Sequence, residues 1–340
     1  MFEGKKILIT GGSGSLGKAL TRKLLKENVH SIRIFSRNEI KQIDMQNEFE
    51  DNPKLRFFIG DVRDRERLFR AMEGVNVVFH TAALKHVPVV EYNPFEAIQT
   101  NVIGSQNVID ASHHENIEYC VAIGTDKAVS PVNVYGATKL LMEKLFVSAN
   151  NYVDTIKYST KFLATRYGNV LGSSGSVVPK FIQQIKNNQK ITVTDPKMTR
   201  FTITIDDALD FILNSVSESQ GSETFIPKLK AYNIMDLKDA IISILGDSPF
   251  EIINIRSGEK MNETLINKTE MDYTIENEKQ FILLRPEFFA SEKLKYHNYT
   301  EPNEISEHSS DVVEKLTVNE IKNLILKAGI LESASNNSVS

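Results

Sequence analysis

Short β-rich runs alternate with helical patterns through the first half of this 340-residue chain. Several of the runs are continuously apolar, such as Ile7-Leu8-Ile9 and Val77-Val78-Phe79, which is typical of strands covered on both faces. The alternation predicts a Rossmann-like, doubly wound α/β fold, with a parallel sheet between two layers of helices. The predicted strands are Lys6–Thr10, Ser31–Ser36, Leu55–Asp61, Val75–Ala83, Glu118–Gly124 and Phe162–Val170, and the predicted helices include Leu16–Lys26 and Pro94–Asn116.

A glycine-rich segment, Thr10-Gly11-Gly12-Ser13-Gly14-Ser15-Leu16-Gly17, follows the first predicted strand and opens the first helix. Its glycines let the backbone turn tightly and approach a pyrophosphate, and the helix N-terminus offers free N–H groups to that anion. A glycine-rich turn without a ligand is the alternative, but the position in a βαβ unit favours a dinucleotide. We expect the binding residues to be Gly11, Ser13, Gly14, Ser15, Leu16 and Gly17.

The end of the second predicted strand bears on the choice of cofactor. An NAD site usually has a carboxylate here for the ribose 2′-hydroxyl, whereas this chain has Ser36 and Arg37. A guanidinium can pair with a 2′-phosphate through two parallel hydrogen bonds, so NADP is favoured over NAD. The alternative is that Arg37 is a solvated charge and that Glu39 serves NAD.

The pattern of alternation ends near residue 170, where the glycine- and serine-rich segment 172–176 predicts a flexible loop. We expect residues 1–170 to form the NADP-binding domain, to which residues 199–228 return. Residues 171–330 would form a smaller substrate-binding lobe, and the small, polar residues 331–340 predict a disordered tail.

Tyr135 and Lys139 are four residues apart, so on a helix both side chains face one ligand. A nearby ammonium favours tyrosinate by lowering the pKa of the phenol, which prepares the tyrosine to take a hydroxyl proton as hydride leaves the carbon. Thr125, which precedes this helix at the end of a strand, completes the expected site. Asn101 is predicted to be a helix-surface amide with at most a supporting role.

Asp126 and Lys127 directly follow Thr125, and they indicate the type of reaction. Two adjacent ionisable groups at this position cost desolvation energy unless they pair or act. An acid and a base are what elimination of water across C5–C6 of a sugar requires once C4 is a ketone. A weak surface ion pair is the alternative.

The composition excludes several classes of protein. A formal net charge of −4 gives no basic surface for nucleic acid. No window reaches the roughly 18 apolar residues that a membrane helix needs, and the N-terminus lacks the apolar stretch of a signal peptide. With one cysteine no intrachain disulfide can form, so a cytoplasmic location without membrane contact is expected. No metal site is predicted, because His113 and His114 lack further ligands at metal spacing.

Several motifs resemble those of the soluble, configuration-inverting UDP-N-acetylglucosamine 4,6-dehydratases, which are extended short-chain dehydrogenases/reductases that open pseudaminic acid synthesis. The resemblance extends from Met1 to about residue 265. Its motifs are Thr125-Asp126-Lys127-Ala128, Asn133-Val134-Tyr135-Gly136-Ala137-Thr138-Lys139, Arg166-Tyr167-Gly168-Asn169-Val170, Ala82-Ala83-Leu84-Lys85-His86-Val87-Pro88, Thr194-Asp195-Pro196-Lys197-Met198-Thr199-Arg200-Phe201 and Gly258-Glu259-Lys260.

The resemblance implies roles for individual side chains. Tyr135 would take the C4 hydroxyl proton, Lys127 would remove the C5 proton and return one to the other face, and Asp126 would help expel water. Lys139 would hold the nicotinamide ribose. Further implied cofactor contacts are Asp61, Val62, Ala82 and Lys85. Implied contacts to the substrate, UDP-N-acetylglucosamine, are Lys85, Asn169, Val177, Thr194, Arg200, Arg256 and Glu259. A salt bridge between lobes is the alternative for both arginines, and the family is typically a homo-oligomer.

Other enzymes of the same fold remain alternatives. A sugar-nucleotide 4-epimerase or reductase needs no acid–base pair after the threonine, and a dehydratase/5-epimerase often has methionine in place of Tyr135. The run 307–311 and the predicted helix Val318–Leu326 resemble the latter group. Membrane-anchored relatives carry a hydrophobic N-terminal region that is not expected here. The chain departs from the dehydratase pattern at Gly124, Ser174 and Ser257, where serine, a basic residue and proline are usual.

Overall fold

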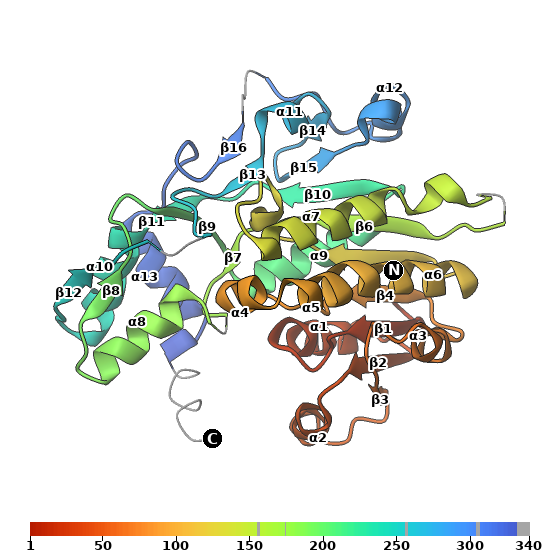
Figure 1. Ribbon diagram of the computed structural model, residues 1–340, viewed down its shortest axis with the longest axis horizontal. Helices are drawn as coiled ribbons and strands as arrows, with labels where there is room; N and C mark the ends of the chain where they lie inside the picture. Colours follow the sequence, from red (N-terminus) through yellow and green to blue (C-terminus); the bar gives the residue numbers. More distant parts are fainter. Residues whose placement is uncertain (155–156, 174, 256–257, 304–306, 332–340) are drawn as a thin grey trace.

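A nine-stranded sheet forms the centre of the molecule, with helices on both faces (Figure 1). The computed structural model describes residues 1–154, 157–173, 175–255, 258–303 and 307–331. Ser174, Arg256, Ser257 and residues 332–340 of the predicted tail therefore lie outside the described residues. In spatial order the strands are β14 (Thr274–Glu276), β15 (Gln280–Leu283), β10 (Glu223–Pro227), β6 (Lys161–Thr165), β5 (Tyr119–Ile123), β4 (Val77–His80), β1 (Lys6–Thr10), β2 (Ser31–Ser36) and β3 (Leu55–Ile59).

The order of the first six strands, 3-2-1-4-5-6, is that of a doubly wound dinucleotide-binding sheet, which confirms the predicted fold class. These strands pair in parallel, and β10 continues the parallel part beside β6. Both pairings of β15 are antiparallel, an addition that the sequence pattern did not predict. The strand order reverses between β1 and β4, and ligands of such sheets bind outside the carboxyl ends of the strands at that reversal.

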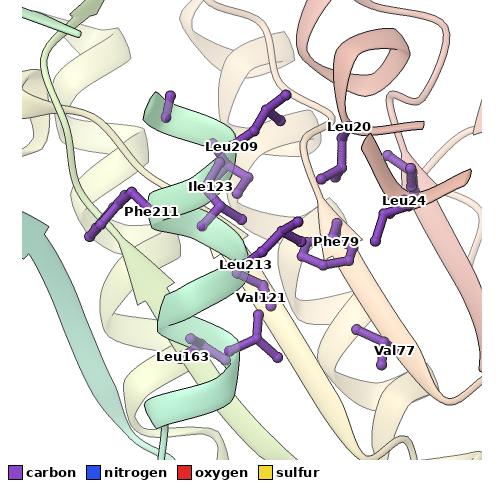
Figure 2. Packing of buried hydrophobic residues seen from close by; sticks show 14 of the residues in the cluster. Leu20, Leu24, Val77, Phe79, Val121, Ile123, Leu163, Leu209, Phe211 and Leu213 are labelled. Atoms are coloured by element: carbon purple, nitrogen blue, oxygen red, sulfur yellow. The ribbon is translucent and has the colours of Figure 1, made fainter. Parts of the chain in front are cut away.

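Alternate side chains of each central strand supply two apolar layers. Ile7 and Ile9 face α1 (Ser15–Leu25) and α9 (Ile205–Glu218), as the twofold repeat of a strand requires. Leu8 points to the other face, toward α3 (Arg65–Met72), α6 (Gly104–His114) and α7 (Val134–Val147). Figure 2 shows Leu209 and Leu213 of α9 against Val121, Ile123 and Phe79 of the sheet, with Leu20 and Leu24 of α1 alongside. The first half of the chain also forms the helices α2 (Glu39–Glu48), α4 (Val87–Tyr92) and α5 (Pro94–Ile98).

Several predicted elements differ from the structure in their extent. The strands predicted over Leu55–Asp61 and Val75–Ala83 are shorter, at Leu55–Ile59 and Val77–His80, and two other elements are divided or end early. The helix expected over Pro94–Asn116 is divided by a π-helical turn, Gln99–Ile103, in which the side-chain amide of Asn101 binds the backbone of Leu84 in the loop after β4. The strand expected over Phe162–Val170 ends at Thr165, because Arg166 turns into buried ion pairs. The following β7 (Asn169–Val170) belongs to a different, three-stranded sheet.

A third apolar cluster lies beyond one end of the sheet, on the left of Figure 1, and forms the core of a smaller lobe. It gathers α8 (Val177–Lys186), α10 (Ile234–Leu245) and α13 (Val318–Lys327). In the three-stranded sheet, β9 (Thr199–Ile203) pairs with β7 on one side and with β11 (Ala231–Asn233) on the other. The two-stranded sheets pair β8 (Ile191–Val193) with β12 (Phe250–Ile252) and β13 (Thr264–Ile266) with β16 (His308–Ser309). The short helices α11 (Lys268–Met271) and α12 (Phe289–Glu292) flank β14 and β15. Among the described residues, no helix combines the length and apolar character that crossing a bilayer requires.

Candidate active site

The glycine-rich segment forms a tight turn from β1 into α1. Gly11 has φ of +68°, and a Cβ there would lie 2.8 Å from the backbone of Ala82. A Cβ at Gly17 would lie 2.4 Å from the carbonyl oxygen of Gly12. Gly14 is the N-cap of α1, and because it has no side chain, no capping hydrogen bond among the described residues occupies the backbone N–H groups of the first turn; the following Ser15 is exposed. These N–H groups are available to an anion, so the glycine-rich turn forms a cradle that fits a pyrophosphate.

The predicted ribose-binding residues lie together at the ends of β2 and β3. The Ser36 hydroxyl accepts hydrogen bonds from Ser13 Oγ and Gln42 Nε2, both at 2.9 Å. Arg37 is half exposed, and its guanidinium lies 3.6 Å from Asp61. Burial acts to raise the pKa of Asp61, but hydrogen bonds and charge from Arg63, together with the charge of Arg37, lower it overall. Arg37 therefore stands at the edge of the cradle with a loosely held carboxylate partner.

Tyr135 and Lys139 are both buried in the first two turns of α7, which Asn133 caps by accepting a hydrogen bond from the Gly136 backbone N–H at 2.7 Å. Lys139 Nζ donates to the carbonyl oxygen of Ile123 at 2.7 Å, and burial lowers its pKa to about 8. Burial raises the pKa of Tyr135 to about 12, although the charge of Lys127 and a hydrogen bond with Thr125 oppose this. The expected net lowering of the tyrosine pKa is therefore wrong for the protein alone, because desolvation outweighs the nearby cation.

Asp126 and Lys127 occupy a 3₁₀ turn at the carboxyl end of β5, and they are not a surface ion pair. Asp126 is fully buried, and its Oδ1 accepts from Lys127 Nζ at 3.1 Å and from Thr125 Oγ1 at 2.9 Å. Lys127 Nζ also donates to Asn169 Oδ1 at 3.3 Å. A buried acid and a cation thus meet at the end of β5, and Thr125 links them to Tyr135.

Three further residues, for which the sequence predicted no role, lie around the Asp126–Lys127 pair. Glu263 is buried, and its Oε1 lies 3.3 Å from Lys127 Nζ. Lys260 Nζ donates to the carbonyl oxygen of Val129 at 2.6 Å, and Tyr232 is buried within reach of the charge of Lys127. The only signal in the sequence was the motif at 258–260, which lies just before Glu263 but does not include it.

The predicted substrate-binding residues fall into two sets. The first set lies around Lys127. The Arg200 guanidinium is 3.6 Å from Glu259 and 3.9 Å from Glu263, which also pairs with Lys127, and Asn169 accepts a hydrogen bond from Lys127. The Arg200 guanidinium also donates to the carbonyl oxygens of Thr199, Met261 and Lys260 at 2.8–2.9 Å. In the second set, Val177 begins α8, Thr194 Oγ1 contacts the sulfur of Met198, and Lys85 follows β4, where burial lowers its pKa.

Asn101 is fully buried, so its prediction as a helix-surface amide is wrong. Its Oδ1 accepts from the Leu84 backbone N–H at 2.8 Å, and its Nδ2 donates to the Leu84 carbonyl oxygen at 2.9 Å and to Thr138 Oγ1 at 3.0 Å. Asn101 therefore joins the loop that carries Lys85 to the helix that carries Tyr135. The π-helical turn aims this amide, and such turns recur at functional sites.

Gly124 stands where the dehydratase pattern has serine, and the structure gives the reason. Its backbone N–H donates to the carbonyl oxygen of Thr165 at 2.7 Å, and a Cβ would lie 2.3 Å from the same oxygen. The carboxyl ends of β5 and β6 approach too closely for a side chain at this position.

Comparison with known proteins places these features in a family. An inverting UDP-N-acetylglucosamine 4,6-dehydratase of Campylobacter jejuni is 48% identical over 83% of this chain and 84% of its own length. A protein of Rickettsia bellii named UDP-glucose 4-epimerase is 38% identical over 93% of this chain and 99% of its own.

Solved structures agree with the fold. The structure of Pen from Bacillus thuringiensis has a TM-score of 0.88 and 39% identity, and the match covers 96% of this chain and 99% of that one. A dTDP-glucose 4,6-dehydratase of Streptomyces venezuelae, solved with NAD, has a TM-score of 0.68 at 20% identity over 75% and 86% of the two chains and shares the fold. The family model described as polysaccharide biosynthesis protein matches residues 7–285. The chain therefore belongs to this family of polysaccharide biosynthesis proteins.

Proposed function

We propose that this chain is a UDP-N-acetylglucosamine 4,6-dehydratase that inverts C5. The observation that carries the proposal is the buried Asp126–Lys127 pair, held at 3.1 Å beside Tyr135. Simple oxidation or epimerisation at C4 needs no such pair, whereas loss of water across C5–C6 needs both an acid and a base. The Campylobacter jejuni relative supports both the substrate and the configuration.

The glycine cradle fits a dinucleotide, and we assign NADP to it. Gly11, Gly14 and Gly17 would let the pyrophosphate reach the first turn of α1, while Lys139 would hold the nicotinamide ribose. Ser36 and Arg37 would bind the 2′-phosphate, because no carboxylate stands at the end of β2. When bound, the cofactor would accept a hydride from C4 and return it to C6.

The proton transfers can be followed on the chain's own residues. Tyr135, in its tyrosinate form, would take the C4 hydroxyl proton. Lys127 would pass a proton to Asp126 across their 3.1 Å hydrogen bond, which leaves a neutral amine and a carboxylic acid. The amine then removes the C5 proton while the acid protonates the departing C6 hydroxyl, so the pair returns to ammonium and carboxylate. Finally Lys127 protonates C5 on the other face and recovers a proton from Tyr135. The proton that completes the released water thus comes from Lys127 through Asp126, and the C4 hydroxyl proton, passed on by Tyr135, replaces it on Lys127.

The name of the Rickettsia bellii relative favours one second candidate, a UDP-sugar 4-epimerase. One experiment separates the two. The purified protein is incubated with UDP-N-acetylglucosamine in deuterated water, and the product is followed by NMR. A dehydratase gives a C6 methyl group and deuterium at C5, and coupling constants report the C5 configuration. Formation of UDP-N-acetylgalactosamine without solvent deuterium would refute the proposal.

The preference for NADP has its own test. Arg37→Ala should weaken binding of NADP at least tenfold and leave binding of NAD nearly unchanged, because only NADP carries the 2′-phosphate. Equal losses for both cofactors would contradict the assignment.

We also propose a homo-oligomer in the cytoplasm. Exposed apolar side chains gather on neighbouring α4, α5 and α7 and on the π-helical turn, where a second copy could cover them. They are Val89, Tyr92, Phe95, Ile98, Ile103 and Leu141. Light scattering should give a multiple of the chain mass of 38.4 kDa, and Phe95→Glu should lower it.

A further inference from the structure

Glu263 is fixed in place from two distant parts of the chain. It directly precedes β13, which lies against the 3₁₀ turn of Asp126 and Lys127. Its backbone N–H donates to Ser310 Oγ at 2.9 Å, and the Ser310 N–H donates to the Glu263 carbonyl oxygen at 2.8 Å. Ser310 is fully buried and follows β16. These two hydrogen bonds to Ser310 fix the backbone of Glu263 at the position from which its side chain contacts Lys127.

The Lys127 ammonium has three oxygen atoms close to it. It donates hydrogen bonds to Asp126 Oδ1 at 3.1 Å and to Asn169 Oδ1 at 3.3 Å, and it forms an ion pair with Glu263 Oε1 at 3.3 Å. Glu263 Oε2 and Asp126 Oδ2 are buried and make no hydrogen bond within the described residues. Buried carboxylates of this kind are costly without a cation, and Lys127 serves both of them.

The other groups that face Lys127 do not supply a negative charge that could take the place of Glu263. Among the described residues, they are Arg200 from β9, Tyr232 from β11, Tyr135 from α7 and Lys260 from the segment before β13. Burial and the charge of Arg200 act to lower the pKa of Lys127, but the charges of Asp126 and Glu263 raise it overall. Asp126 alone would have to oppose the burial and the neighbouring cations.

We propose that Glu263 is a positioning residue that keeps the working proton on the Asp126–Lys127 pair. This inference rests on the proposed function, in which the pair must hold one proton to act as acid and base in turn. A second carboxylate on the ammonium holds that proton to higher pH. Removing its charge lets the pair lose the proton at lower pH, after which neither expulsion of the C6 hydroxyl nor return of a proton to C5 can proceed.

The test uses Glu263→Gln, which keeps the shape of the side chain and removes its charge. Competitive acetylation of the substrate-free protein, read by mass spectrometry, reports the neutral fraction of the Lys127 amine, whose side chain is one-quarter exposed. An opposite charge at this distance shifts a pKa by about one to three units, so the labelling rate of Lys127 at neutral pH should rise tenfold or more. An unchanged rate would overturn the proposal.

Turnover gives the second measurement. The alkaline limb of the pH profile of kcat should move to lower pH by about one unit or more in Glu263→Gln, with a smaller change in KM. Equal loss of kcat at every pH would indicate a merely structural role and overturn the proposal. If the wild type released no dehydrated product, the proposed function would fail, and the labelling result would still decide the relation between Glu263 and Lys127.

Glu292→Gln is the matched control. Glu292 is as deeply buried as Glu263 and pairs with Arg285 away from this cluster, so the labelling of Lys127 and the pH profile should both stay as in the wild type. Ser310→Ala removes the hydroxyl that accepts the Glu263 backbone N–H without changing any charge, and it should produce a smaller shift of the same sign. If Glu263→Gln did not fold, as judged by far-UV circular dichroism, Ser310→Ala would decide the question alone, and an unshifted profile would count against the proposal.

Discussion

Replacing Arg166 by methionine should destabilise the protein by about 3–5 kcal/mol. Arg166 is fully buried where the chain leaves β6, and it makes paired hydrogen bonds to Glu143 and to Glu270. It also donates to the Leu265 carbonyl oxygen at 2.8 Å. Glu143 is about 1% exposed, so without Arg166 its charge would be buried with no partner. Methionine fills a similar volume, so the lost charge accounts for most of the effect.

Urea unfolding followed by far-UV circular dichroism measures the loss, since the chain has no tryptophan for fluorescence. Two comparisons isolate the cause. Lys5→Met, which removes a partly exposed pair with Glu118, should cost about 1 kcal/mol or less. Adding Glu143→Gln to Arg166→Met should restore part of the lost stability, because the amide carries no charge to desolvate. A loss for Arg166→Met no larger than that for Lys5→Met would refute the argument.

Three further predictions follow from the cofactor and catalytic residues. Tyr135→Phe should lower kcat by a factor of about 10²–10⁴ because the proton acceptor is lost, while the urea midpoint hardly moves; near-normal turnover would exclude the assigned role. Gly11→Ala places a Cβ 2.8 Å from Ala82 at a φ of +68°, so calorimetry should show cofactor binding weakened at least tenfold, and unchanged affinity would contradict the predicted cradle. Burial lowers the pKa of Lys139 from 10.5 to about 8. Between pH 8 and 10.5 the lysine is therefore protonated in the unfolded chain but largely neutral in the folded protein, so the free energy of unfolding should rise with pH in this range. Lys139→Met should remove this part of the rise in thermal melting curves, and identical pH dependence in both proteins would count against it.

Much of the sheet could be predicted from local pattern. The bounds predicted for β1 and β2 match the structure exactly, because each strand is a short apolar run between polar residues. The division of Pro94–Asn116 could not be predicted, since it depends on a contact between Asn101 and the distant Leu84. Likewise, the residues around Arg166 follow the pattern of a strand, and its carboxylate partners lie 23 and 104 positions away in the sequence. The end of β6 at Thr165 could therefore not be predicted from local pattern.

The candidate site shows the same division. Thr125, Asp126, Lys127 and Tyr135 are close in the sequence, and the structure brings them together at the carboxyl end of β5. Their roles in catalysis stay predictions. Glu263 comes from a segment with no periodic pattern, and only the folded chain brings it to Lys127. Contacts between distant segments were therefore the part that a single sequence could not supply.

Two ion pairs join the segment that carries Glu263 and Glu270 to the nucleotide-binding sheet, and they limit which parts of this enzyme can be exchanged with those of a relative. A chimera that joined its nucleotide-binding sheet to the C-terminal half of another relative would inherit Lys127 and Arg166 from one parent. Their acidic partners, Glu263 and Glu270, would have to come from the other parent in matching positions. The halves of this chain are therefore not interchangeable modules, and a successful exchange would have to transfer these charge pairs together.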